Sequence, residues 1–247
     1  MLLAQVFLSI IIPAYNEEAR ISATLERVIG YLGDRSYSWE VLVADDGSTD
    51  ETASLVTGMT ANRPNLRLMS LGHKGKGWAV KNAMLEAKGE YRVLCDADLS
   101  VPIEQVERLL PPQAQGVDIA VGSRAAEGAR RIGEPSRRHL MGRIYNILVR
   151  IIAVPGLQDT QCGFKCYRGD VVPALFRRLT MDGFAFDVEV LFLAAKEGMT
   201  LQEIPVDWYY QENSKVRAFR DSVAMTLDLL KIRWRNLRGR YRGREQG

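Results

Sequence analysis

The chain has 247 residues, of which 47% are hydrophobic and 26% charged, and its formal net charge is +3. These are ordinary values for a globular protein with a substantial core, so they exclude a disordered or low-complexity chain. The three cysteines are too few for a disulfide framework, and we expect them to be ordinary thiols in a reducing compartment.

The first apolar run lacks a basic leader and a small-residue cleavage site. It ends at Pro13, well short of the roughly 20 apolar residues that a membrane span needs. Charged residues interrupt every later apolar run. We therefore expect a protein that is not integral to a membrane.

The first half of the chain alternates apolar runs of strand length with helical patterns. Strands rich in Val, Ile and Leu are predicted at 7–12, 39–44, 66–71, 91–95 and 118–122. Helices are predicted near 17–31, 50–60, 77–88 and 102–110. This alternation predicts an α/β fold with a mainly parallel central sheet, flanked by helices on right-handed crossovers.

The second half has a different pattern. Residues 125–138 are charged and contain glycine, which predicts a mobile loop. Further helices are expected at 139–153, near 170–178, over 184–198 and from about 218, and a strand is expected around 201–209. The 139–153 and 218–237 segments are amphipathic, so each could pack on the protein core or lie on a membrane surface.

Polar or charged residues follow every predicted strand of the first half. The segments are PAYNEE, DDGSTD, GHKGKG, DADLS and GSR. Ligands of parallel sheets bind beyond the carboxyl ends of the strands. The pattern therefore predicts a binding site at this edge of the sheet.

Asp96 and Asp98 stand one residue apart at such a strand end. Two carboxylates this close repel each other unless a cation lies between them, and oxygen ligands suit Mg²⁺ or Mn²⁺ bridged to substrate phosphates. The alternative is an acidic pair that caps the helix near Pro102. Asp45 and Asp46 could likewise bind a ribose or base, or form a turn. Together these residues favour a metal-bound nucleoside diphosphate.

The segment GHKGKG could be mistaken for a phosphate-binding loop of an NTPase. It lacks the Walker spacing and the Ser or Thr after the lysine, so we exclude that class. Lys74 and Lys76 at a helix N-terminus could still contact a phosphate, or the segment could be a plain turn into the helix.

The C-terminal end is basic. Seven Lys or Arg residues from Lys231 onward stand against Glu245 alone, which gives +6 there and −3 for the remainder. Such a tail is typical of binding to anionic lipid or nucleic acid, or of a solvated end. No nucleic-acid-binding module is recognisable, so we expect no nucleic-acid partner.

The motifs SIIIPAYNEE, VLVADDGSTD, DADLS and GSR, in this order, resemble the inverting nucleotide-sugar glycosyltransferases of family 2, which have the GT-A fold. The motifs DTQCGFK, FAFDVE, IPVDW and DSVAMTLDLLKIRW narrow the resemblance to the polyprenyl-phosphate glycosyltransferases, dolichyl-phosphate β-glucosyltransferases first and mannose synthases next. The resemblance covers nearly the whole chain. It implies a GT-A catalytic domain over 1–216, with a nucleotide-sugar half (1–123) and an acceptor half (124–216), before a helix and basic tail (217–247).

The resemblance also implies roles for individual residues. Asp96 and Asp98 would bind the metal, joined by Ser100, which replaces a glutamine of the mannose synthases and favours the glucose branch. The donor would be held by Pro13, Tyr15, Glu17, Ala44, Asp46, Lys76, Asp96, Ala97 and Lys215. The acceptor would be held by Arg130, Arg137, Arg138, Asp159 and Gln161. The residues nearest the chemistry would be Asp98, Arg124, Arg131 and Asp187.

Some of these roles have alternatives. Asp159 and Gln161 could orient the arginines of the acceptor loop or form a turn before a strand. Asp187 stands where relatives with hydroxyl acceptors carry a catalytic base, but it could instead favour a helix N-terminus. A phosphate acceptor is already ionised at pH 7 and needs no strong base.

The implied reaction moves a hexose, glucose from UDP-glucose, onto a polyprenyl or dolichyl phosphate with Mg²⁺ or Mn²⁺. The implied location is the cytoplasmic face of a membrane, with peripheral contact to anionic lipid. The sequence leaves a homodimer open. Alternatives are GDP-mannose or another nucleotide sugar as donor, a soluble acceptor, or a catalytically silent membrane-surface adaptor.

Overall fold

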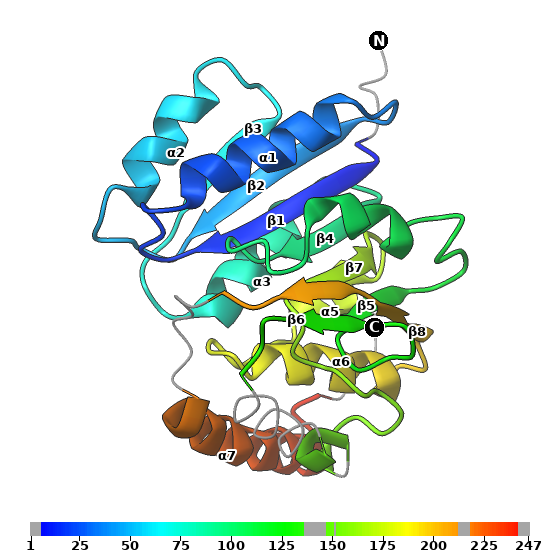
Figure 1. Cartoon of the computed structure of the whole chain (residues 1–247). Helices are drawn as coiled ribbons and strands as arrows, with labels where there is room; N and C mark the ends of the chain where they lie inside the picture. Colours follow the sequence, from blue (N-terminus) through cyan, green and yellow to red (C-terminus); the bar gives the residue numbers. More distant parts are fainter. Residues whose placement is uncertain (1–5, 136–146, 151, 212–217, 242–247) are drawn as a thin grey trace, which may run out of the picture.

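The structure is a computed structural model that describes residues 6–135, 147–150, 152–211 and 218–241, with residues 218–225 described by their backbone alone. A seven-stranded sheet with the order β3-β2-β1-β4-β7-β5-β8 forms its centre (Figure 1). Its strands are β1 (Leu8–Ala14), β2 (Trp39–Asp45), β3 (Leu66–Ser70), β4 (Tyr91–Cys95), β5 (Ile119–Ser123), β7 (Phe164–Arg168) and β8 (Leu201–Pro205). All neighbours are parallel except those of β7, so the predicted mainly parallel sheet is confirmed.

Helices cover both faces of this sheet. They are α1 (Ile21–Gly33), α2 (Thr52–Thr60), α3 (Lys76–Glu86), the 3-10 helix η1 (Ile103–Leu109), α5 (Val172–Phe176), α6 (Phe186–Lys196) and α7 (Ala218–Leu237). In β1, Ile10 and Ile12 pack with α1 and η1 on one face, whereas Ile11 packs with α3 and α6 on the other. Because the strands are buried on both faces, their sequences are continuous apolar runs instead of alternating ones.

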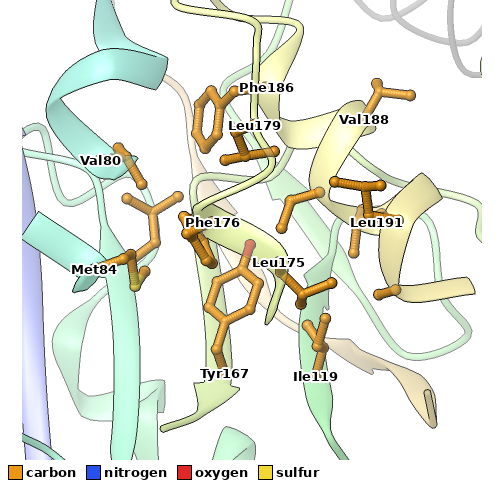
Figure 2. Close-up of a cluster of buried hydrophobic side chains, with 14 of the residues drawn as sticks. Val80, Met84, Ile119, Tyr167, Leu175, Phe176, Leu179, Phe186, Val188 and Leu191 are labelled. Carbon is orange, nitrogen blue, oxygen red and sulfur yellow. The ribbon is translucent and has the colours of Figure 1, made fainter. Parts of the chain in front are cut away.

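The core of the second half lies under β7. Figure 2 shows Tyr167 of β7, Phe176 of α5 and Val80 of α3 converging in one cluster. The rings of Tyr167 and Phe176 meet edge to face, with centroids 5.2 Å apart. This cluster fixes α3 and the segment before α6 on the same face of the sheet, next to the carboxyl end of β4.

Strand β7 is the main departure from the predicted order of elements. It comes from the second half of the chain but lies between β4 and β5, antiparallel to both. The sequence offered only a turn before a strand here, as the alternative role of Asp159 and Gln161. In the structure Lys165 is fully buried.

Three other predictions differ in detail. The helix expected at 102–110 is the 3-10 helix η1, and the strand expected around 201–209 is two strands, β8 and β9 (Asp207–Tyr209). The loop prediction is wrong at β6 (Arg130–Ile132), which pairs in parallel with β9. That pairing joins distant segments and is supported by an ion pair between Arg130 and Asp207, which local composition does not reveal.

The helix expected at 139–153 falls mostly outside the described residues; 147–150 are helical. Helix α7 is present at the predicted position. In the described part of the chain, no helix combines the length and apolar character that a membrane span requires.

Candidate active site

A cavity of about 340 Å³ lies at the carboxyl ends of β1, β2 and β4. The motifs PAYNEE, DDGSTD, GHKGKG and DADLS meet here, as parallel strands predict, whereas GSR does not line the cavity. Its walls are formed by Pro13, Ala14, Tyr15, Glu17, Arg20, Asp46, His73, Gly75, Lys76, Ala79, Asp96, Ala97, Asp98, Gly183 and Phe184. Seven of the nine predicted donor residues are among them.

The wall below β1 and β2 combines a flat ring pair with a carboxylate. Tyr15 stacks on His73, with centroids 4.2 Å apart and planes 17° apart. Asp46 accepts hydrogen bonds from the backbone N–H groups of Lys74 at 3.0 Å and Gly75 at 2.8 Å, and its Oδ2 lies 2.8 Å from Nδ1 of His73. A planar heterocycle and a hydroxyl-bearing sugar fit such a surface.

Asp45 has a different role from Asp46. Its carboxylate bonds to the hydroxyl and backbone N–H of Ser48, and its side chain is buried. This is the turn chemistry that the sequence offered as the alternative.

The wall at the end of β4 is acidic. Asp96 Oδ1 lies 2.6 Å from the ammonium of Lys76, and the backbone N–H of Asp96 donates to the carbonyl of Gly163 at 3.1 Å. Asp98 Oδ1 accepts from the backbone N–H of Ser100 at 2.9 Å. Burial, and secondly the charge of Asp96, raise the pKa of Asp98 above its usual range. A cation beside Asp98 would favour its ionised form.

The chemistry of this wall fits a hard divalent cation. Asp96 and Asp98 present carboxylate oxygens to one cavity, which suits Mg²⁺ or Mn²⁺. Among the residues that the structure describes, no group of three or more His, Cys, Asp or Glu side chains could hold a metal. Asp96 and Asp98 would hold the cation, and phosphates and water would complete its coordination, as is common for Mg²⁺.

Ser100 lies beside this wall but not on it. It lines an adjoining pocket of about 20 Å³ with Asp96, Gly163 and Trp208, and its carbonyl accepts from the backbone N–H of Tyr209. Asp96 is the one carboxylate that borders both pockets. The predicted role of Ser100 as a metal ligand thus gains no support from its position.

Gly163 was not predicted as a site residue. A Cβ added there would lie 1.9 Å from Oδ2 of Asp96, so only glycine leaves room for that carboxylate. The residue stands inside the quoted DTQCGFK motif, but its contact with Asp96 depends on the pairing of β4 with β7. Local sequence could not show it.

The predicted acceptor residues that the structure describes, Arg130, Asp159 and Gln161, do not line the main cavity. Arg124 makes two ion-paired hydrogen bonds to the fully buried Asp159, from Nε at 2.6 Å and Nη2 at 2.8 Å. Burial alone would raise the pKa of Asp159, but the charge and hydrogen bonds of Arg124 hold it well below the usual carboxyl range. Asp159 thus orients Arg124, whereas the described loop arginines Arg130 and Arg131 pair with other carboxylates.

The two loop arginines that the structure describes have partners of their own. Arg130 pairs with Asp207 on the surface, at 2.7 Å. Arg131 pairs with Glu134 at 2.9 Å and donates from Nε to the carbonyl of Arg124 at 3.0 Å. Gln161 donates its backbone N–H to Asp159. Arg137, Arg138 and Lys215 lie outside the described residues.

Asp187 is buried near the site without lining the cavity. It lies 2.5 Å from the ammonium of Lys165, which also donates to the carbonyl of Cys162 at 2.7 Å. Burial raises the pKa of Asp187, and the charges of Lys165 and Lys76 oppose that shift without cancelling it. Glu189 instead accepts from Thr180 and Met181, which makes it structural.

The remaining donor predictions divide between wall and core. Pro13, Tyr15, Glu17 and Ala97 line the cavity, whereas Ala44 is fully buried in the core and contributes no wall. His73, the stacking partner of Tyr15, was overlooked although it stands in the quoted GHKGKG segment. A histidine in a loop gives no signal of stacking before the fold is known.

A mainly parallel sheet with a carboxylate-lined cavity at its strand ends is the architecture of an α/β protein that binds its ligand at that edge of the sheet. The model of the family Glycosyl transferase family 2 matches residues 9–176. The chain belongs to this family, and it is a glycosyltransferase. The predicted membership of family 2 is confirmed.

Three curated relatives are named dolichyl-phosphate beta-glucosyltransferase. The protein of Dictyostelium discoideum is 34% identical, and the match covers 95% of this chain and 76% of that protein. The protein of Saccharomyces cerevisiae is 33% identical, with 96% and 77% covered. The human protein is 34% identical, with 95% and 77% covered. The chain therefore spans about three quarters of each relative.

Solved structures support the predicted GT-A fold. Glucosyl-3-phosphoglycerate synthase from Mycobacterium tuberculosis, in complex with Mn²⁺, UDP-glucose and phosphoglyceric acid, superposes with a TM-score of 0.68 at 19% identity, over 99% of this chain and 83% of that one. Its UDP complex gives a TM-score of 0.66 at 20% identity, over 92% and 81%. At this identity the likeness establishes the fold.

Proposed function

We propose that this protein transfers glucose from UDP-glucose to a polyprenyl or dolichyl phosphate, with inversion at the sugar carbon. The single observation that carries the proposal is the cavity in which Asp46, Asp96 and Asp98 meet at the strand ends. The names of the curated relatives support glucose and a dolichyl-phosphate acceptor. The UDP-glucose and Mn²⁺ complex of the structural neighbour supports the donor class.

The cavity divides naturally between the parts of the donor. Tyr15 and His73 offer a stacking surface for the base, and Asp46 a carboxylate for a ribose hydroxyl. Asp96 and Asp98 would hold Mg²⁺ or Mn²⁺, which supplies positive charge for the diphosphate as it leaves. Lys76 adds the cationic side chain of this wall.

The acceptor nucleophile is proposed to be an oxygen of a phosphate monoester. It is ionised near neutral pH, so its attack requires positioning more than proton removal. This agrees with Asp187 being buried against Lys165 instead of facing the cavity. We propose that Asp187 positions the wall beneath Lys76, and that Arg124 and Arg131, with Arg130, Arg137 and Arg138, attract the acceptor phosphate.

We further propose that the enzyme works at the cytoplasmic face of an anionic membrane and contacts it through α7. This helix packs Leu229 and Ile232 on the core, while its opposite side carries an apolar stripe on which each residue is more than half exposed. The stripe consists of Leu227, Leu230, Trp234 and Leu237. Lys231 is exposed beside it, and the guanidinium of Arg238 lies 3.8 Å from the ring centroid of Trp234.

An apolar stripe with basic neighbours matches the interface of a bilayer with anionic headgroups. The helix lies at one end of the molecule, remote from α1 and α2 (Figure 1). The three cysteines are free and buried, which accords with a reducing compartment.

The reaction is tested with purified protein, Mn²⁺, UDP-glucose and polyprenyl phosphate in detergent or liposomes. We expect a glucosylated lipid and UDP in equal amounts. GDP-mannose and UDP-glucuronate are the competing donors, and a water-soluble phosphate is the competing acceptor. Product with a competing substrate but none with the proposed one contradicts this assignment.

Membrane contact is tested by co-sedimentation with vesicles of phosphatidylglycerol and phosphatidylcholine. Changing both Leu230 and Trp234 to Glu should lower binding by about tenfold or more, because each side chain loses its apolar burial. Leu55→Glu on α2 is the matched control and should bind like wild type, since Leu55 is exposed at a remote site. If the double variant binds vesicles normally but converts a dimer to a monomer, the stripe is an interface between copies and the membrane proposal is wrong.

A further inference from the structure

Lys76 is fixed at its backbone in an unusual way. It is the first residue of α3 and stands between Gly75, with a φ of 127°, and Gly77. A Cβ at Gly75 would lie 2.6 Å from the carbonyl oxygen of Asp182, and one at Gly77 would lie 2.5 Å from that of Met181. The start of α3 therefore packs directly on the 181–183 backbone. Because its neighbours are both glycines, Lys76 is the residue of this turn whose side chain reaches the cavity.

Its partner Asp96 is fixed as well. The backbone N–H of Asp96 bonds to Gly163, and the Oδ2 side of its carboxylate faces the space that a Cβ of Gly163 would fill. Oδ1, on the other side, is bonded to Lys76 at 2.6 Å. A cation that approaches the open side of this carboxylate consequently meets the ammonium of Lys76.

The side chain of Lys76 is long enough to turn away from Asp96. It has four rotatable carbon bonds, and 21% of it is exposed to the cavity. Asp98 and Asp187 also attract it, so its positive charge helps to balance this acidic wall. It lines the same cavity as both proposed metal ligands.

We propose that Lys76 is an exchangeable counterion. It neutralises Asp96 while the site is empty, gives up Asp96 when a divalent cation binds, and turns its ammonium to the diphosphate of the donor. Only the second step, in which Lys76 contacts the diphosphate, rests on the proposed nucleotide-sugar function. Competition between Lys76 and the cation for Asp96 follows from the 2.6 Å contact between the ammonium and the carboxylate.

A thermodynamic consequence separates this role from a plain phosphate contact. Without donor, a bound cation takes Asp96 from Lys76 and no new anion replaces it, so the cation binds weakly. With donor present, Lys76 gains the diphosphate, so cation and donor strengthen each other's binding by the same factor. Lys76 thus couples the two ligands.

The test measures Mn²⁺ binding alone, UDP binding alone and UDP binding at saturating Mn²⁺, by calorimetry on the full chain without acceptor. For Lys76→Met we expect Mn²⁺ alone to bind about tenfold more tightly and UDP with Mn²⁺ about tenfold more weakly, of the order of one charge-assisted hydrogen bond. UDP alone should be unchanged. The coupling factor should therefore fall by about tenfold.

Lys74→Met is the matched control. It removes the same charge two residues away, but the ammonium of Lys74 lies 4.0 Å from the ring centroid of Trp78, not on Asp96. Its three binding constants should stay within about twofold of wild type, as expected for an exposed side chain that does not line the cavity. An equal gain in Mn²⁺ affinity in both variants would mean a general charge effect and would overturn the exchange.

Other outcomes are equally decisive. Weaker Mn²⁺ binding in Lys76→Met means that Lys76 supports the metal site, and unchanged Mn²⁺ binding means that it does not compete; both contradict the inference. If UDP binds no variant, the proposed donor is wrong, while the Mn²⁺ measurement still decides the competition.

A measurement on the wild-type protein tests the same inference without any substitution, so it holds even if a variant misfolds. Acetylation of Lys76, followed by mass spectrometry, should rise with Mn²⁺ alone and fall below the ligand-free level with Mn²⁺ and UDP. A fall with Mn²⁺ alone would overturn the exchange.

Discussion

The donor cavity and the acceptor side of this molecule differ in how their charged side chains are balanced. At the donor cavity, carboxylates gather on one wall and outnumber the lysine that faces them, so the wall awaits further positive charge. On the acceptor side, each arginine that the structure describes already has a carboxylate: Arg124 has Asp159, Arg130 has Asp207 and Arg131 has Glu134. A surplus of charge indicates binding, whereas a matched pair indicates structure until a ligand is shown to displace one partner.

The largest effect is expected when a carboxylate of the acidic wall is removed. Asp98→Asn should lower the glucosyl-transfer rate by about 10³-fold, because a metal contact contributes several kcal/mol to the transition state. The folded protein raises the pKa of Asp98, so its charge is unfavourable in the fold. The melting temperature of Asp98→Asn should therefore equal or exceed that of wild type.

Asp170→Asn is the control for that change. Its carboxylate is exposed and pairs with Arg168, away from the cavity, so the rate should stay within about twofold of wild type. A variant of Asp98 that keeps its rate would place the catalytic metal elsewhere.

The next largest effect is a loss of stability, and it is expected at the Arg124–Asp159 pair on the acceptor side. Asp159→Asn leaves the guanidinium of Arg124 without its buried partner and should lower the free energy of unfolding by about 3–5 kcal/mol, measured in urea. The folded pKa of Asp159 lies below its unfolded value, so the pair stabilises the protein above about pH 4, and that stabilisation is lost as the pH falls.

The difference between wild type and Asp159→Asn should accordingly shrink on acidification. A difference that stays constant between pH 6 and pH 3 would show that the pair is not the cause. Loss of transfer activity beyond the loss of folded protein would instead assign Arg124 to the chemistry.

A smaller effect is expected from a substitution that displaces the carboxylate of Asp96. Gly163→Ala places a methyl group on the carboxylate of Asp96 and should reduce Mn²⁺-dependent transfer by about 10- to 100-fold, since a shift of about 1 Å in a catalytic group has such consequences. Gly30→Ala is the control, because a Cβ there meets nothing and lies in helix α1. It should retain full activity and gain about 0.5–1 kcal/mol of stability.

The smallest effect is expected at the exposed pair. Arg130→Ala removes an ion pair that faces water, so its melting temperature should not differ measurably from that of wild type. If transfer to the lipid phosphate nevertheless falls, Arg130 leaves Asp207 to meet the acceptor. Unchanged transfer would show the pair to be structural only.

The contrast between the regions also explains what the sequence could predict. Strands β1, β2 and β4 carry apolar runs that are followed by acidic or polar motifs, and their parallel pairing brings those motifs together. Fold and donor cavity could therefore be predicted from local pattern and resemblance. The position of Ala44, inside the core instead of on the wall, required the structure because it depends on the pleat of β2.

The acceptor side could not be predicted in the same way. Which carboxylate pairs with Arg124 or Arg130 depends on contacts over 35 and 77 positions of the chain. A buried lysine such as Lys165 looks like a surface residue until its partner Asp187 is brought beneath the sheet by α6. Periodicity carries no information about such pairs.

The central place of β7 has a consequence for synthesis on the ribosome. Strand β4 ends at Cys95, but the neighbour on its open edge begins at Phe164, roughly 70 residues later, which is about 4–14 s of translation. During that interval a nascent chain holds an unpaired strand edge of apolar sequence, the kind of edge that invites association with other chains. Newly made copies should therefore need protection by a chaperone until Arg168 has emerged.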